Sequence, residues 1–198
     1  MKSLKLLLII LTSAILISAC SSNTRYTDPG AVDTTSTDFS STDLQTTTKK
    51  MVSGLLTFPP IVKLTAKERP ILFVDQIQNN TDEHIDTNNL SNMVMTELTQ
   101  SGKFRFVDMS QVKAVHNQLS YQRDSGLVDQ KTAIKVGHQL GAQFMLYGSI
   151  SNIVQRNSSQ KSVYFLITMK LLNLQTGIVE WADQKQIRKV QKRATFGW

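Results

Sequence analysis

The stretch VYFLITMKLLNLQTGIVEW, residues 163–181, decides the fold class of this 198-residue chain. Its first part, 163–174, is a run of mostly aliphatic and aromatic residues, and its last part, 177–181, is a shorter run of the same kind. Gln175 and Thr176 separate the two runs, and Gly177 can adopt positive φ at the end of a tight turn. The stretch therefore predicts a β-hairpin.

Elements of both types precede the hairpin. Apolar runs predict strands at 70–78, 103–108 and 142–151. Helical spacing and caps predict helices at 48–56, 85–102, 110–119 and 129–141. The segment 121–128 is predicted to be a polar loop. In the helix at 85–102, Leu90, Val94, Met95 and Leu98 share one face, and Gly102 suits the position after its end. The order of elements predicts an α/β fold: a single domain, 49–198, with a mixed β-sheet flanked by helices.

The N-terminus has the pattern of an export signal. Lys2 and Lys5 precede an apolar run that is too short to span a bilayer as a permanent helix. Small residues follow and end at Ala19 and Cys20. We expect residues 1–19 to be a signal peptide that is removed between Ala19 and Cys20.

The segment ISAC, which contains the only cysteine of the chain, resembles the lipobox of bacterial lipoproteins. That resemblance implies that the Cys20 thiol carries a lipid and that the mature chain begins there. Ser21 stands where inner-membrane lipoproteins of enteric type carry aspartate, which implies an outer-membrane location. Several acyl chains together give stable anchoring, because each buried CH₂ contributes about 0.8 kcal/mol.

The next segment, 20–48, is polar. Eighteen of the 28 residues from Ser21 to Thr48 are Ser, Thr or Asp, and the few apolar residues show no helical or strand period. Such a composition cannot bury enough surface to offset the entropy of ordering. We therefore expect 20–48 to be a lipidated, disordered tether.

Charge is divided unequally along the chain. The tether carries Arg25 against four aspartates, a net charge of −3, whereas 49–198 carry 19 Lys and Arg against 11 Asp and Glu, a net charge of +8. Export and the absence of a nucleic-acid motif exclude nucleic acid as the partner of this basic domain. Acidic protein surfaces, anionic lipid head groups and anionic wall polymers are the partners that such a charge would attract.

Three segments resemble the LpoB family of outer-membrane lipoproteins. They are GKFRFVD (102–108), AIKVGHQLGAQFMLYGSI (133–150) and LLNLQTGIVEWADQKQIRKVQKRATFGW (171–198). The resemblance implies a domain similar to the TolB N-terminal domain that binds a class A penicillin-binding protein and stimulates its peptidoglycan synthesis. The tether is shorter than in many members and has one proline, Pro29.

No residue pattern indicates catalysis. His84, His116 and His138 are not spaced as metal ligands, and no nucleophile elbow or phosphate loop is present. We therefore expect a monomeric binding protein, not an enzyme, without a cofactor or metal. The main alternative is a lipoprotein component of a curli-type secretion assembly, which would need additional membrane-crossing strands.

Candidate contacts to the partner lie in the polar loop and in the basic C-terminal part. They are Tyr121, Arg123, Arg156, Lys161, Tyr164, Arg188, Lys189, Lys192 and Arg193. The aromatic residues of the predicted strands have a structural role instead: Phe104, Phe106, Phe144, Phe165 and Trp181 are predicted to fill the core.

Overall fold

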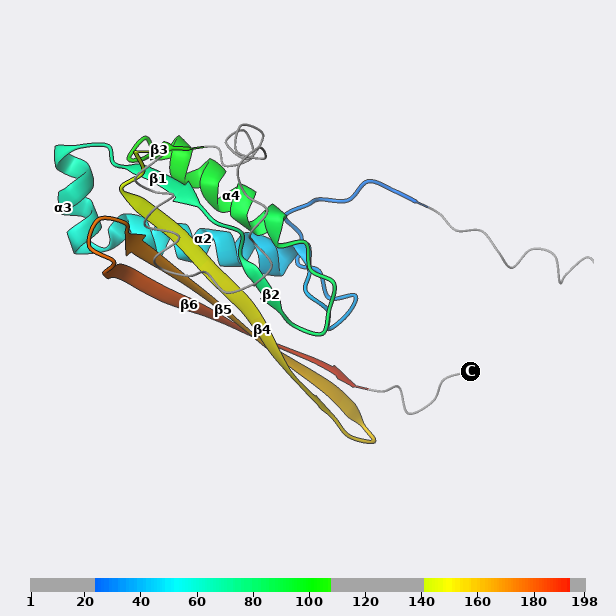
Figure 1. Ribbon diagram of the computed structural model, residues 1–198. Helices are drawn as coiled ribbons and strands as arrows, with labels where there is room; N and C mark the ends of the chain where they lie inside the picture. The colour runs from blue at the N-terminus through cyan, green and yellow to red at the C-terminus, as the bar shows by residue number, and fades with distance from the viewer. Residues whose placement is uncertain (1–23, 108–140, 193–198) are drawn as a thin grey trace, which may run out of the picture. The chain divides into compact units, whose positions relative to one another are not determined.

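The computed structural model describes residues 24–107 and 141–192, which form three helices and six strands (Figure 1). The helices are α2 (Ser41–Thr57), α3 (Pro59–Lys67) and α4 (Thr87–Gln100); the strands are β1 (Ile71–Val74), β2 (Gln78–Asn80), β3 (Arg105–Phe106), β4 (Phe144–Arg156), β5 (Gln160–Asn173) and β6 (Val179–Lys192). The chain from Val32 onward forms one compact unit, and the fold described below is that of this unit.

The strands form one mixed sheet in the order β3-β1-β4-β5-β6, with β2 also paired to β4. The short strands β1 and β2 run parallel to β4, and β3 runs parallel to β1. The long strands β4, β5 and β6 are antiparallel and paired almost throughout, so they form a three-stranded ribbon. The predicted α/β fold with a mixed sheet is confirmed.

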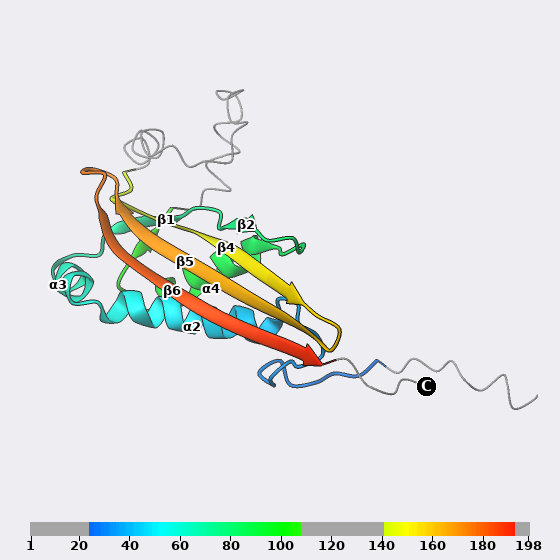
Figure 2. The same cartoon turned by 90° about the horizontal axis from the view of Figure 1, so that it is seen from below.

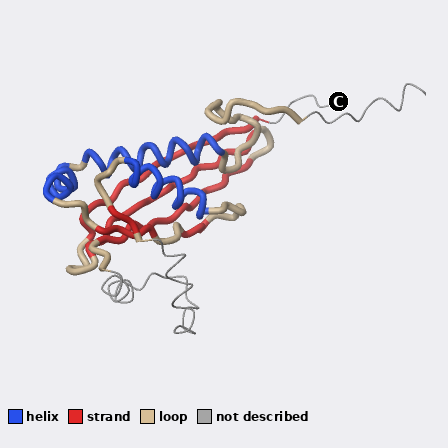
Figure 3. Tube along the Cα trace, turned by 90° about the horizontal axis from the view of Figure 1, so that it is seen from above, coloured by secondary structure: helices blue, strands red, loops and turns tan. Residues whose placement is uncertain are grey.

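Helices α2 and α4 cover one face of the sheet, as the two opposite views show (Figures 2 and 3). Alternate residues of β5 point to these helices because strand side chains alternate between faces. Val163, Phe165 and Ile167 on that side are completely buried. They pack in one cluster with Met51 and Leu55 of α2, and each such burial contributes roughly 1.5–3 kcal/mol.

A second, smaller apolar cluster involves the other face of the sheet at one end of the ribbon. It contains Phe73, Ala142, Met145, Leu172 and Leu174, and all five are buried. Burial also raises the pKa of the Tyr147 phenol beside this cluster. The ribbon is therefore covered on both faces at the end where β4 begins, in contrast to its other end.

The hairpin prediction and most of the predicted core are confirmed. Gly177 has φ +73° between β5 and β6, and Gly102 has φ +70° after α4. The five aromatic residues assigned to the core contribute to the main cluster: Phe104, Phe106, Phe144, Phe165 and Trp181. Each of these local predictions rested on a residue whose backbone or burial preference is strong.

Two predicted boundaries are wrong. The domain begins before residue 49, because α2 starts at Ser41 and buries Asp43, Thr47 and Thr48. The tether prediction relied on polar composition, but these three polar residues lie on the buried face of the helix. In addition, Pro59 was predicted only to stop the helix before it. It also begins α3, because a residue in the first turn of a helix needs no N–H for helical hydrogen bonding.

The last strand is also longer than predicted. The hairpin prediction ended its second strand at Trp181, whereas β6 continues to Lys192. Pairing with β5 holds this basic segment in the sheet although its sequence lacks apolar alternation. The predicted helices at 110–119 and 129–141 and the loop at 121–128 lie outside the described residues, except for Gly141.

The hydroxyl of Thr47 provides a test of the core. It is completely buried and has no hydrogen-bond partner within the described parts of the chain. Thr47→Val should therefore raise the free energy of unfolding in urea by about 1 kcal/mol, because it removes an unsatisfied polar group with little change in shape. The control is Thr48→Val, which should be destabilising, since the Thr48 hydroxyl donates to the Leu44 carbonyl at 2.9 Å. A stabilising effect of both substitutions would contradict this assignment.

Candidate partner-binding site

The predicted contact residues that the structure describes gather at one end of the ribbon. This ribbon end comprises residues 153–156 of β4, 160–165 of β5 and 187–192 of β6, which are joined by strand pairing. Arg156 pairs with Lys161, Tyr164 with Arg188, and Gln160 with Lys192. Strand pairing thus brings together residues that are up to 32 positions apart in the sequence.

One face of the ribbon end points away from the helices and is open. Ile153, Tyr164 and Arg188 lie in one row across the three strands. The Arg188 Cζ atom lies 5.5 Å from the centroid of the Tyr164 ring, a cation–π geometry. Ile153 is 60% exposed and Val190, in the neighbouring row, is 53% exposed. An aromatic ring, a stacked guanidinium and two exposed aliphatic side chains form a surface that suits protein docking.

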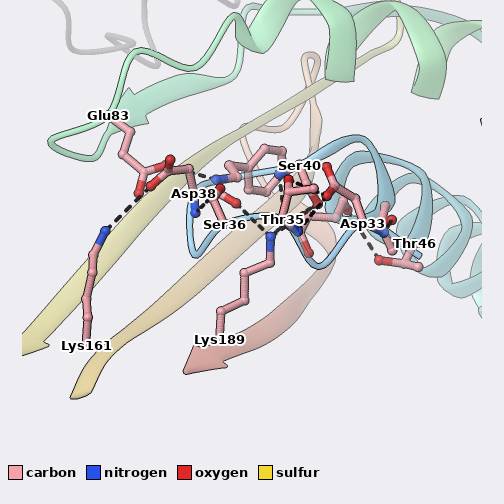
Figure 4. A network of polar contacts seen from close by, with 12 residues as sticks. Asp33, Thr35, Ser36, Asp38, Ser40, Thr46, Glu83, Lys161 and Lys189 are labelled. Atoms are coloured by element: carbon pink, nitrogen blue, oxygen red, sulfur yellow. Dashed lines mark hydrogen bonds and ion pairs between the residues drawn. The ribbon is translucent and has the colours of Figure 1, made fainter. Parts of the chain in front are cut away.

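The opposite face of the ribbon end is occupied by the chain itself. Lys189 projects there (Figure 4), and its Nζ atom lies 2.6 Å from Asp43 Oδ2 at the start of α2. It also donates to the Asp38 carbonyl at 2.6 Å and to the Ser40 hydroxyl at 3.2 Å. The side chains of Lys189 and Asp43 are only 15% and 7% exposed. Lys189 therefore joins the last strand to the beginning of the domain.

The segment Val32–Phe39, which we call the strap, lies against this face. The Phe39 ring meets the Phe165 ring edge-on, with centroids 5.6 Å apart. The Phe39 amide donates to Glu83 Oε2 at 3.0 Å, and Lys161 Nζ lies 3.5 Å from Asp38 Oδ1. Figure 4 shows Glu83 and Lys161 approaching the strap from different elements. The strap thus contacts both the sheet and the loop before α4.

Local sequence explains why the strap turns into α2 at this point. Ser40 and Asp43 have the spacing of a capping box, and the Ser40 amide donates to Asp43 Oδ2 at 2.8 Å. Earlier in the strap, the hydroxyl and amide of Thr35 donate to Asp33 and hold the pKa of its carboxyl below its usual range. The Ser-x-x-Asp spacing is the sequence signal that could have located this helix start.

A cleft of about 520 Å³ lies between the strap and the loop that precedes α4. Asp38, Glu83, His84 and Asp86 are among the residues that line it. All three carboxylates have internal partners: Glu83 accepts from the Phe39 amide, Asp86 caps α4 by accepting from the Asn88 amide, and Asp38 pairs with Lys161. The described part of the chain contains no group of three His, Cys, Asp or Glu arranged to hold a metal ion.

The structure divides the predicted contacts into three groups. Tyr164, Arg188 and Lys192 belong to the strand positions of the open face, whereas Arg156 is paired with Lys161 and points to the same side of the ribbon as Lys161. Lys161 and Lys189 face the strap and are engaged within the chain. The remaining predicted site residues lie outside the described residues: Ala19, Cys20, Tyr121, Arg123 and Arg193.

Sequence reasoning missed two residues of the open face, Ile153 and Val190. Both are exposed aliphatic residues at the end of long strands. The sequence of β6 does not show which side of the strand faces the helices, because the polar residues Lys185 and Lys189 occupy positions that point to the helix side. No local pattern would have identified Val190 as part of a surface.

The Lys189–Asp43 pair predicts a selective loss of stability. Lys189→Met keeps the aliphatic stem but leaves the Asp43 carboxylate without its cation, so the free energy of unfolding in urea should fall by about 1–3 kcal/mol. Lys192→Met removes the same charge three residues further along β6 and should change it by less than about 0.5 kcal/mol. Equal effects of the two substitutions would contradict the structural role of Lys189.

Comparison with known proteins gives a consistent result. The family model described as "Peptidoglycan-synthase activator LpoB" matches residues 43–187. The penicillin-binding protein activator LpoB of Salmonella typhimurium is 27% identical over 119 residues, which are 60% of this chain and 52% of the relative. The corresponding protein of Edwardsiella piscicida is 25% identical over 144 residues, 73% of this chain and 66% of the relative. The chain spans about half the length of the first of these relatives.

The fold agrees with solved structures. The LpoB C-terminal domain from Salmonella enterica superposes with a TM-score of 0.55 at 24% identity and covers 73% of this chain and 98% of that domain. The Escherichia coli domain gives the same TM-score at 23% identity. The family match begins at Asp43, inside α2, and extends to Ile187 in β6. The chain therefore belongs to the peptidoglycan-synthase activator LpoB family.

Proposed function

We propose that this protein is a non-enzymatic activator of a bifunctional class A penicillin-binding protein and thereby regulates peptidoglycan synthesis. The observation that carries this proposal is the family match, which covers residues 43–187 and so nearly the whole described domain. The curated relatives are themselves named penicillin-binding protein activators. The fold supports the assignment further, and we infer that it also resembles the TolB N-terminal domain.

The open face of the ribbon end is the proposed contact surface. Its exposed Ile153 and Val190 supply apolar area, and the stacked Tyr164 and Arg188 supply the residue types that dominate binding energy in protein interfaces. Lys192 adds positive charge at the margin, which would accelerate encounter with an acidic partner. Tyr121, Arg123 and Arg193 remain proposed contacts on the basis of sequence alone.

Activation would arise from differential affinity. A protein that binds the active conformation of a synthase more tightly than the inactive one shifts the synthase toward activity by that difference in binding free energy. A rigid surface is well suited to this role, because little conformational entropy is lost on binding. The continuous pairing of β4, β5 and β6 gives the ribbon end such a surface.

The anchor is a separate part of the proposal. We infer that Cys20 carries the lipid after removal of residues 1–19, that the protein is held at the outer membrane facing the periplasm, and that it acts as a monomer. None of the described helices has the length and apolarity needed to cross a membrane. Labelling with a radioactive fatty acid tests the anchor: Cys20→Ser should abolish incorporation.

The activator role is tested by glycan-strand synthesis. Purified class A penicillin-binding proteins from the same organism should polymerise lipid-linked precursor severalfold faster when the chain from Ser21 onward is added in excess. A class B synthase with its polymerase partner is the control and should not respond. Unchanged rates for every class A synthase, despite a folded domain, would overturn the proposal.

The contact surface is tested by two substitutions with a matched control. Tyr164→Ala and Arg188→Ala should each weaken binding of the synthase by about tenfold, as expected for central interface residues. Lys170→Ala removes an exposed cation at the other end of β5 and should change the affinity less than twofold. Surface plasmon resonance against the immobilised synthase measures all three. Equal losses for Lys170→Ala and Arg188→Ala would indicate general charge attraction instead of a defined surface.

A further inference from the structure

The strap leaves little chain for a lipid tether. A tether from Ser21 to the start of the strap has eleven residues, instead of the 28 that composition alone suggested. Eleven residues reach at most about 36–40 Å when fully extended, and a coil of that length spans about 17–20 Å on average. The docked strap therefore restricts how far a lipid at Cys20 lets the domain travel.

The contacts of the strap are few and mostly at the surface. Of its eight residues, only Thr37 is buried, at 3% exposure, and Phe39 is half-buried. The strap contains no helix or strand, and its main fixed points are the Phe39 ring, the Phe39 amide, Asp38 and the Asp33 amide, which donates to Thr42 Oγ1 at 2.8 Å. Segments with few buried apolar contacts open at lower free energy than the core around them.

The start of α2 is much more firmly held. Asp43 accepts from Ser40 and pairs with the buried Lys189, and Thr47 and Met51 are buried within the next two turns. If the strap detached, Lys189 would lose its contact with the Asp38 carbonyl but keep the one with the Asp43 carboxylate. Detachment would therefore stop at Ser40 and leave the helix and the ribbon intact.

From this contrast we propose that the strap is a releasable length of tether. In the docked state it shortens the tether; under load from the lipid anchor it detaches up to Ser40 and adds eight residues, about 26–29 Å of reach. The maximum span from the lipid to the domain rises from about 36–40 Å to about 63–68 Å. The open face at Tyr164 and Arg188 is on the other side of the ribbon and does not change. This inference rests on the proposed anchor and extends it.

Native-state hydrogen exchange tests whether the strap opens by itself. The chain from Ser21 onward is measured at increasing, non-denaturing urea. The amides of Asp33 and Phe39, which donate to Thr42 Oγ1 and Glu83 Oε2, should exchange at least about tenfold faster than those of Met51 and Leu55. Their exchange should also depend little on urea, because strap opening exposes little surface. Equal rates and equal urea dependence for the strap and α2 would overturn the proposal.

A matched pair of strap variants makes the test specific. Phe39→Ala removes the ring that packs on Phe165 and should accelerate exchange of the Asp33 amide by about tenfold. Val32→Ala alters a side chain that is 73% exposed at the outer end of the strap and should leave that rate unchanged. An acceleration by Val32→Ala as large as that by Phe39→Ala would contradict a strap held by Phe39.

Pulling on single molecules tests release under load. Handles are attached through Ser21→Cys and through Gln175→Cys, in the exposed turn between β5 and β6. A step of about 26–29 Å of released chain, less the distance that the docked strap already spans, should precede unfolding of the domain. A single unfolding event without this step would overturn the proposal. The hydrogen-exchange and pulling experiments involve no synthase. A failed activation assay would therefore count against the proposed function and not against release of the strap.

Discussion

The ion pair between Lys189 and Asp43 is the contact on which the two ends of this domain depend. It joins the first turn of α2 to the last strand of the sheet, 146 positions later in the sequence. Both side chains are largely buried, so neither charge can be left unpaired without a substantial cost. The pair thereby fixes where the helix begins, holds the far part of β6 under the strap and closes the helix-side face of the ribbon end.

This closure gives the ribbon end two different faces. On the helix side, Lys161 and Lys189 are used by the strap, and Phe165 is covered by Phe39. On the other side, Tyr164 and Arg188 stack on each other and remain accessible. Strand alternation alone separates the two sets, since neighbours in the sequence point in opposite directions. The division of cations between internal and external roles is therefore a property of the sheet, and it leaves only one face of the ribbon end open.

Several parts of the fold followed from local residue preferences. Gly102 and Gly177 marked chain reversals because positive φ is easiest for glycine, and α4 followed from the spacing of its apolar residues. The start of α2 and the length of β6 did not follow. Both segments are polar, and the partners that stabilise them, Lys189 for Asp43 and β5 for β6, lie elsewhere in the chain.

The sequence by itself determined the α/β class, the hairpin, most of the aromatic core, the resemblance to the LpoB family and the expectation of an anchor at Cys20. Each rests on a local pattern or a contiguous motif. Only the tertiary structure decided that residues 32–48 belong to the domain and that Lys189 is internal while Arg188 is exposed. The physical reason is that burial of a polar residue depends on a partner distant in the sequence, and composition carries no information about that partner.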